Sequence, residues 1–90
     1  MINITEQAKQ MLKKILNANV DFPEGRLRVM DRGQGKLGLG IDIEMPEDEL
    51  VKYEGSTILV IEREFAVNLK GITLDVEDNG KGSELIIHSE

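Results

Sequence analysis

The chain has 90 residues, of which 40% are hydrophobic and 31% are charged, with a formal net charge of −6 at pH 7. This length predicts a single globular domain spanning residues 1–90. The net negative charge argues against general nucleic-acid binding, which depends on neutralising phosphates. The absence of cysteine excludes disulfides, thiolate ligands and a thiol redox couple within these residues.

Targeting and membrane signals are missing from the sequence. No apolar run approaches the roughly 20 residues that a membrane-spanning helix needs, so we expect no membrane association. The first residues lack the basic start and apolar stretch of a signal peptide. We therefore expect a cytoplasmic protein.

The first predicted element is a helix with Thr5 as its N-cap. Apolar residues then recur with the three- and four-residue spacing of one helical face: Ala8, Met11, Leu12, Ile15 and Leu16. The polar and Pro/Gly-containing stretch 17–25 ends this helix. Because the apolar face needs a partner, we expect the helix to lie on a sheet.

After Gly25 the hydrophobic period changes to two, which indicates strands. The predicted strands cover residues 26–29, 39–45, 51–53, 57–61, 72–76 and 84–88. A glycine-rich stretch from Gly33 to Gly40 separates the first two, and we expect a long hairpin loop there. Residues 62–70 predict a short helix closed by Gly71. Connections this short favour mostly antiparallel pairing, so the predicted fold is a compact α+β domain of short antiparallel or mixed strands.

The glycine-rich stretch contains a G-x-G-x-x-G string, but its context does not fit nucleotide binding. In a dinucleotide fold this string opens a helix whose N-terminus holds the pyrophosphate. Here a strand follows instead. The stretch also contains no Cys, His, Asp, Glu, Ser or Thr, so it offers no common metal ligand or nucleophile.

No catalytic or metal-binding constellation emerges from the other polar residues. Five acidic residues lack the ligand spacing of a calcium loop and are better explained as solvent-facing: Asp42, Glu44, Glu47, Asp48 and Glu49. The single histidine, His88, cannot form a triad or a three-ligand zinc site without partners. We expect a protein that is not an enzyme and that holds no metal or cofactor.

The basic residues give one candidate site. Arg26, Arg28, Arg32 and Lys36 lie on the strand before the glycine stretch and continue into it. Guanidinium groups beside a glycine-rich backbone could bind a small anion or an acidic partner. The alternative is that these four are ordinary solubilising cations.

The ordered segments together resemble the HesB/IscA family, the A-type iron–sulfur carriers. The most specific segment is residues 69–76, which is similar to the family pattern L-x-G-x-x-[IL]-D-[FY]; further matches are residues 4–8, 27–29, 41–44, 58–62 and 85–89. The family has an S-G-C-S-G loop where this chain has its glycine stretch. Gly35 and Gly38 match the glycines of that loop, and Lys36 takes the position of the cysteine.

The resemblance implies the family's fold and a homodimer, but the cluster ligands do not carry over. Lys36 replaces the loop cysteine, and no Cys-Gly-Cys tail follows residues 85–89 before Glu90. Iron–sulfur clusters require thiolate or occasionally imidazole ligands. The sequence therefore predicts a cluster-free protein of this fold that binds another protein, related to iron–sulfur assembly. The alternative is a module that binds a small anion or an acidic partner.

Overall fold

A computed structural model describes residues 2–34 and 36–89, so Gly35, which matches a family glycine, lies outside the described residues. The elements in chain order are β1 (Asn3–Ile4), α1 (Glu6–Asn19), β2 (Gly25–Gly33), β3 (Lys36–Ile43), β4 (Glu49–Tyr53), β5 (Ser56–Ile61), α2 (Arg63–Asn68), β6 (Ile72–Asp78) and β7 (Ser83–Ser89). None of the described helices is long and apolar enough to cross a membrane.

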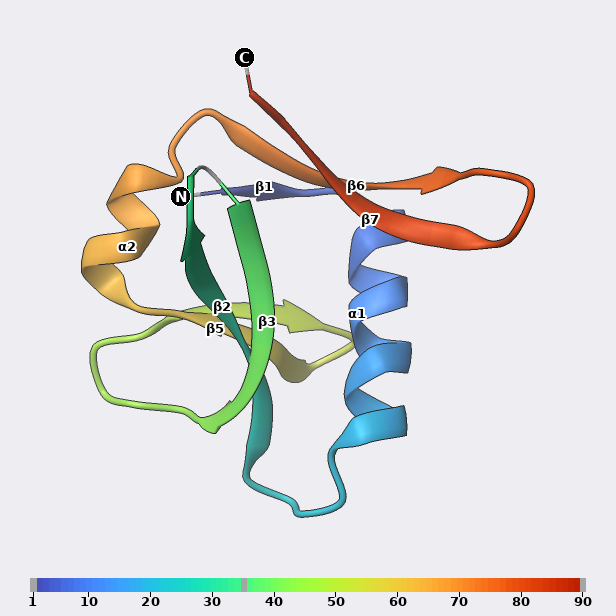
Figure 1. The fold of residues 1–90 in the computed structure, drawn as a ribbon. Helices are drawn as coiled ribbons and strands as arrows, with labels where there is room; N and C mark the ends of the chain where they lie inside the picture. Colours follow the sequence, from blue (N-terminus) through green and yellow to red (C-terminus); the bar gives the residue numbers. More distant parts are fainter. Residues whose placement is uncertain (1, 35, 90) are drawn as a thin grey trace.

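The strands form two sheets, as Figure 1 shows. One has the order β1-β6-β7, and the other has the order β3-β2-β5-β4. The β2–β3, β4–β5 and β6–β7 pairs are antiparallel, whereas β1–β6 and β2–β5 are parallel. Helix α1 packs beside both sheets, with contacts to β6 in one and to β5 in the other. The α+β architecture of short mixed strands confirms the predicted fold class.

The start of α1 is fixed by the predicted cap, Thr5. Its Oγ1 accepts a hydrogen bond from the Ala8 N–H at 3.2 Å, which satisfies a backbone donor at the helix end. The same hydroxyl donates to Asp75 Oδ1 at 2.9 Å, and the Thr5 N–H donates to the Leu74 carbonyl at 3.0 Å. Asp75 belongs to the segment that most resembles the HesB/IscA pattern, and it holds α1 against β6.

The core is aliphatic and is shared by α1, α2 and both sheets. Its buried members are Ile2, Ala8, Leu12, Leu27, Val29, Val51, Ile58, Leu59, Ile61, Ala66, Leu69 and Leu74. Strand β5 is buried most completely, because β2 and β4 flank its edges and helix α1 packs against it. Four consecutive residues of β5, from Ile58 to Ile61, are all 0% exposed.

The predicted long glycine loop is wrong. Strand β2 continues to Gly33 and β3 begins at Lys36, so the connection is a tight turn. Gly33 has φ 81° and Gln34 has φ 55°, which is the left-handed conformation that tight turns require.

The later glycines of the stretch lie within β3, where they make room for side chains of β2. The Arg32 side chain lies against Gly38, and a Cβ on Gly40 would lie 2.5 Å from Met30 Sδ. The glycine richness therefore reflects close packing across the hairpin and not an open loop.

Candidate functional site

The four basic residues of the predicted site are spread along the β2–β3 hairpin. Arg26 lies at the start of β2, where its Nη1 donates to the carbonyls of Pro23 and Gly25 at 2.9 and 2.8 Å. Arg32 and Lys36 flank the turn at the other end. Arg26 and Arg32 are six residues apart along the strand, which corresponds to a distance of about 20 Å. The structure thus places Arg32 and Lys36 at one end of the hairpin and Arg26 at the other.

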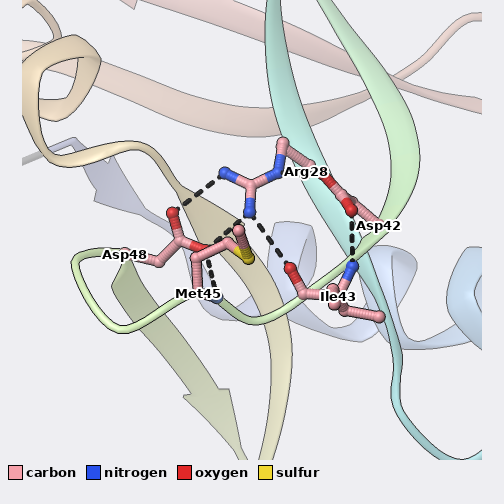
Figure 2. Close-up of polar contacts among 5 residues, drawn as sticks. All are labelled: Arg28, Asp42, Ile43, Met45 and Asp48. Atoms are coloured by element: carbon pink, nitrogen blue, oxygen red, sulfur yellow. Dashed lines mark hydrogen bonds and ion pairs between the residues drawn. The ribbon is translucent and has the colours of Figure 1, made fainter.

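Arg28 lies between these ends and binds two carboxylates, as Figure 2 shows. Its Nη1 and Nη2 donate to the two oxygens of Asp48 at 2.9 and 2.6 Å. Its Nε donates to Asp42 Oδ2 at 2.8 Å, and Nη2 also donates to the Ile43 carbonyl at 3.1 Å. This two-pronged geometry is the strong form of an arginine–carboxylate pair.

The Arg28–Asp48 pair is mostly withdrawn from solvent. The Asp48 side chain is 4% exposed and that of Arg28 is 15% exposed. The hydrogen bonds from Arg28 lower the pKa of Asp48, the Met45 N–H at 2.8 Å lowers it further, and burial opposes both. The same pair raises the pKa of Arg28. The guanidinium of Arg28 is therefore neutralised within the chain.

Sequence reasoning missed the role of Asp48, which it grouped with exposed carboxylates. Asp42 and Glu44 are exposed as predicted, but the Asp48 side chain is only 4% exposed, because it pairs with Arg28 on a strand 20 residues earlier. Within its turn, the Asp48 N–H donates to the Met45 carbonyl and the Asp48 carboxylate accepts from the Met45 N–H. Within residues 2–34 and 36–89, no group of three His, Cys, Asp or Glu side chains is placed to hold a metal ion.

His88 is exposed, as predicted, and lies near Asp75. Its Nε2 is 3.9 Å from Asp75 Oδ2, and its side chain is 56% exposed. The pKa of Asp75 is lowered first by the Val76 N–H, then by the Thr5 hydroxyl and by His88. This carboxylate is thus engaged in holding the start of α1, together with the Thr5 hydroxyl, which also caps the helix.

An apolar groove lies between the β2–β3 hairpin and the sheet of β6 and β7. Its volume is about 640 Å³, and it is lined by Ile2, Val29, Lys36, Leu37, Gly38, Leu39, Leu74, Leu85, Ile86 and Ile87. Lys36 is the charged member of this lining, and Ile87 is 40% exposed. Sequence analysis missed the groove because its walls come from strands that meet only in the folded chain.

The comparisons with known proteins find a common fold. Neither protein-family models nor curated protein sequences match this chain. Among solved structures, a crystal structure of IscA with a [2Fe–2S] cluster is similar, with a TM-score of 0.63 and 23% identity over 99% of this chain and 85% of that chain.

Two other solved structures agree with this likeness. Escherichia coli SufA, which is involved in the biosynthesis of iron–sulfur clusters, has a TM-score of 0.68 and 15% identity over 98% of this chain and 84% of its own. A protein from Aquifex aeolicus, solved by NMR, has a TM-score of 0.66 and 22% identity over 99% of this chain and 91% of its own. The chain therefore has the fold of IscA and SufA, as the resemblance in its sequence predicted.

The Arg28–Asp48 pair gives a prediction about stability and pH. We expect Asp48→Asn to lower the free energy of unfolding at pH 7 by about 2–4 kcal/mol, because Arg28 loses a nearly buried charged partner. Since the pKa of Asp48 is lower in the folded state, the stabilisation is complete above the unfolded pKa near 4. It is lost as the pH falls through the folded pKa.

Urea unfolding of the wild type and the variant across pH 2–7 measures this difference. Glu47→Gln, at an exposed position of the same turn, is the control and should change stability by less than about 0.5 kcal/mol. A difference between Asp48→Asn and the wild type that stays constant down to pH 2 would contradict the assignment.

Proposed function

We propose that this chain is a non-enzymatic, HesB/IscA-like cytoplasmic protein that binds another protein in iron–sulfur cluster assembly without holding a cluster itself. The observation that carries the proposal is the position of Lys36. In the sequence resemblance it takes the place of the family's loop cysteine, and in the structure it borders an apolar groove, in a chain whose 90 residues contain no cysteine.

The ligand chemistry supports the cluster-free part of the proposal. Cluster iron is held by thiolates or, in some centres, by imidazoles. A lysine ammonium is a cation with donors and no acceptor, so Lys36 repels iron where a thiolate would bind it. His88 is the single imidazole of the chain, and one such ligand does not hold a cluster.

The groove supports the protein-binding part. An apolar cleft with one cation in its lining suits a protein segment that presents aliphatic side chains next to a carboxylate. The aliphatic side chains would cover Leu85 and Ile87, and the carboxylate would pair with Lys36. The partner in this proposal is thus an acidic, apolar segment of an assembly protein.

Site-specific photo-cross-linking in cells tests this proposal. A photoreactive residue at Leu85 should cross-link one defined protein of iron–sulfur assembly, and the additional change Lys36→Glu should reduce that product at least tenfold. The same photoreactive residue at Val67, which is 70% exposed on α2, is the control and should not give that product. Equal products from both positions, or a product indifferent to Lys36→Glu, would contradict the proposed site.

A second candidate function is binding of a small anion or an acidic partner by Arg26, Arg28, Arg32 and Lys36. It is favoured by Arg32 and Lys36, neither of which contacts a carboxylate in the described part of the chain. The neutralisation of Arg28 by Asp42 and Asp48 weighs against participation of all four.

Thermal unfolding in phosphate or sulfate tests this second function. A ligand that binds the native state at ten times its Kd adds about 1.4 kcal/mol of stability, which raises the Tm of a domain of this size by several degrees. Sodium chloride of equal ionic strength controls for screening, and Arg32→Ser with Lys36→Ser should abolish the shift. No shift at millimolar phosphate or sulfate would exclude such a site.

A further inference from the structure

A second pocket lies where the last turns of α1 face the turn between β4 and β5 (Figure 1). Its volume is about 500 Å³, which is within the range of pockets that hold small ligands. Its lining comes from the second half of α1, from the connection between α1 and β2, and from the β4–β5 hairpin. The pocket shares no lining residue with the apolar groove beside Lys36.

The charged residues that line this pocket are all cations. The chain has 17 acidic and 11 basic residues, yet the pocket is lined by Lys13, Arg26 and Lys52 and, within the described residues, by no Asp or Glu. Lys52 makes no ion pair in that part of the chain, and Lys13 pairs with the exposed Glu54 at 3.6 Å. Three full positive charges outweigh the partial negative charge at the end of α1. The pocket therefore favours an anionic ligand.

Arg26 is held in place by the chain and keeps donors that the chain does not use. Its Nη1 donates to the carbonyls of Pro23 and Gly25 at 2.9 and 2.8 Å. Its buried Nε has no hydrogen-bond partner within residues 2–34 and 36–89. A guanidinium has five N–H donors, which is more than these contacts use. A ligand with several oxygen acceptors would supply the partners that are missing.

The β4–β5 turn adds hydroxyl groups on a fixed backbone. Glu54 and Gly55 have φ 52° and 82°, the left-handed conformation of a two-residue hairpin turn. Ser56 and Thr57 follow this turn directly and line the pocket. Hydroxyl groups can donate to the oxygens of an anion. The turn thus holds two neutral donors in the same pocket as the three cations.

Part of the lining is apolar and includes Leu16, Val20 and Phe22. Phe22 is 43% exposed, so its ring is available to cover an apolar group of a ligand. A Cβ on Gly25 would lie 2.1 Å from Val20 Cγ1, so glycine at this position lets Val20 pack against the start of β2. The pocket therefore combines a cationic part with an apolar wall.

We propose that this pocket binds a small organic phosphate monoester. A phosphate monoester carries a charge of −1.5 to −2 at pH 7 and three acceptor oxygens, which match several cations better than one carboxylate does. The phosphate pairs with Lys13, Arg26 and Lys52 and accepts from the hydroxyls of Ser56 and Thr57. The organic group of the ester covers the apolar wall.

This inference goes beyond the proposed function, because it concerns a small molecule at a different pocket. It shares Arg26 with the second candidate function, but Arg32 and Lys36 lie at the other end of the β2–β3 hairpin and take no part. The failure of this pocket to bind its ligand can therefore be told apart from the failure of either proposed function.

An amide NMR titration of the purified chain with phenyl phosphate, at constant pH and ionic strength, tests the site. Phenyl phosphate should bind with a Kd of about 1 mM. It should shift the amide signals of Asn17, Phe22, Gly55 and Ser56 and leave that of Gly33 unchanged. Phenyl sulfate, which has the same shape and a single charge, and inorganic phosphate, which lacks the ring, should each bind at least about tenfold more weakly.

Charge-removing variants identify the cations that hold the phosphate. Lys13→Gln and Lys52→Gln should each raise the Kd of phenyl phosphate about fivefold, and the double variant should raise it more than about tenfold. Lys81→Gln, at an exposed position of the β6–β7 turn, is the matched control and should leave the Kd unchanged. Arg32→Ser with Lys36→Ser should also leave it unchanged, which separates this pocket from the second candidate function.

Several results would overturn the proposal of this phosphate pocket. One is the absence of binding at millimolar phenyl phosphate, and another is a set of amide shifts centred on the turn at Gly33 and Lys36. Normal binding by a folded Lys13→Gln/Lys52→Gln variant would contradict the assigned cations. Equal affinities for phenyl phosphate and phenyl sulfate would show that the pocket does not select a doubly charged ligand.

Discussion

The ion pair between Arg28 and Asp48 holds the connection from β3 to β4 in place, and the order of the larger sheet depends on that connection. In the order β3-β2-β5-β4, the chain leaves β3 at one edge and must reach β4 at the opposite edge. The connection therefore passes β2 and β5, and Asp48 within it binds Arg28 on β2 (Figure 2). Breaking this pair removes two hydrogen bonds from Arg28, whose side chain is only 15% exposed and keeps Asp42 as its remaining carboxylate partner. The pair thus fixes where the connection crosses and how β3 ends.

The same interaction shapes what the hairpin can offer a ligand. Arg28 donates its hydrogen bonds to Asp42, Asp48 and the Ile43 carbonyl. The positive charge that the turn can present to a ligand therefore comes from Arg32 and Lys36. Asp42 is paired with Arg28 although half of its side chain stays exposed. In the proposed function the hairpin presents one of these two cations, Lys36, to a partner.

Local features of this fold could be predicted from the sequence. The cap at Thr5, the apolar face of α1 and the β6–β7 hairpin depend on residues close together in the chain, and each has a recognisable period or turn. The glycine stretch was wrongly predicted to be a loop, because Gly38 and Gly40 lie in a strand. There they leave room for the side chains of Arg32 and Met30 across the hairpin. Such a requirement becomes visible only when the register of the two strands is known.

The parts of the site that sequence reasoning missed are all non-local. The Asp48 side chain is shielded from solvent by its contact with Arg28, on a strand 20 residues away, and no periodic pattern marks its turn. The groove beside Lys36 joins residues from both sheets. Strand β1 has two residues and exists because Asn3 and Ile4 pair with Thr73 and Leu74, so it carries no pattern of its own.

Anaerobic reconstitution with ferrous iron and sulfide tests the central claim, that this IscA-like fold is complete without a cluster. IscA treated in parallel is the positive control, since it is known with a [2Fe–2S] cluster. After desalting, the chain should show no visible chromophore, no retained iron or sulfide, and an unchanged Tm. A stable visible absorption with stoichiometric iron and sulfide would contradict the account.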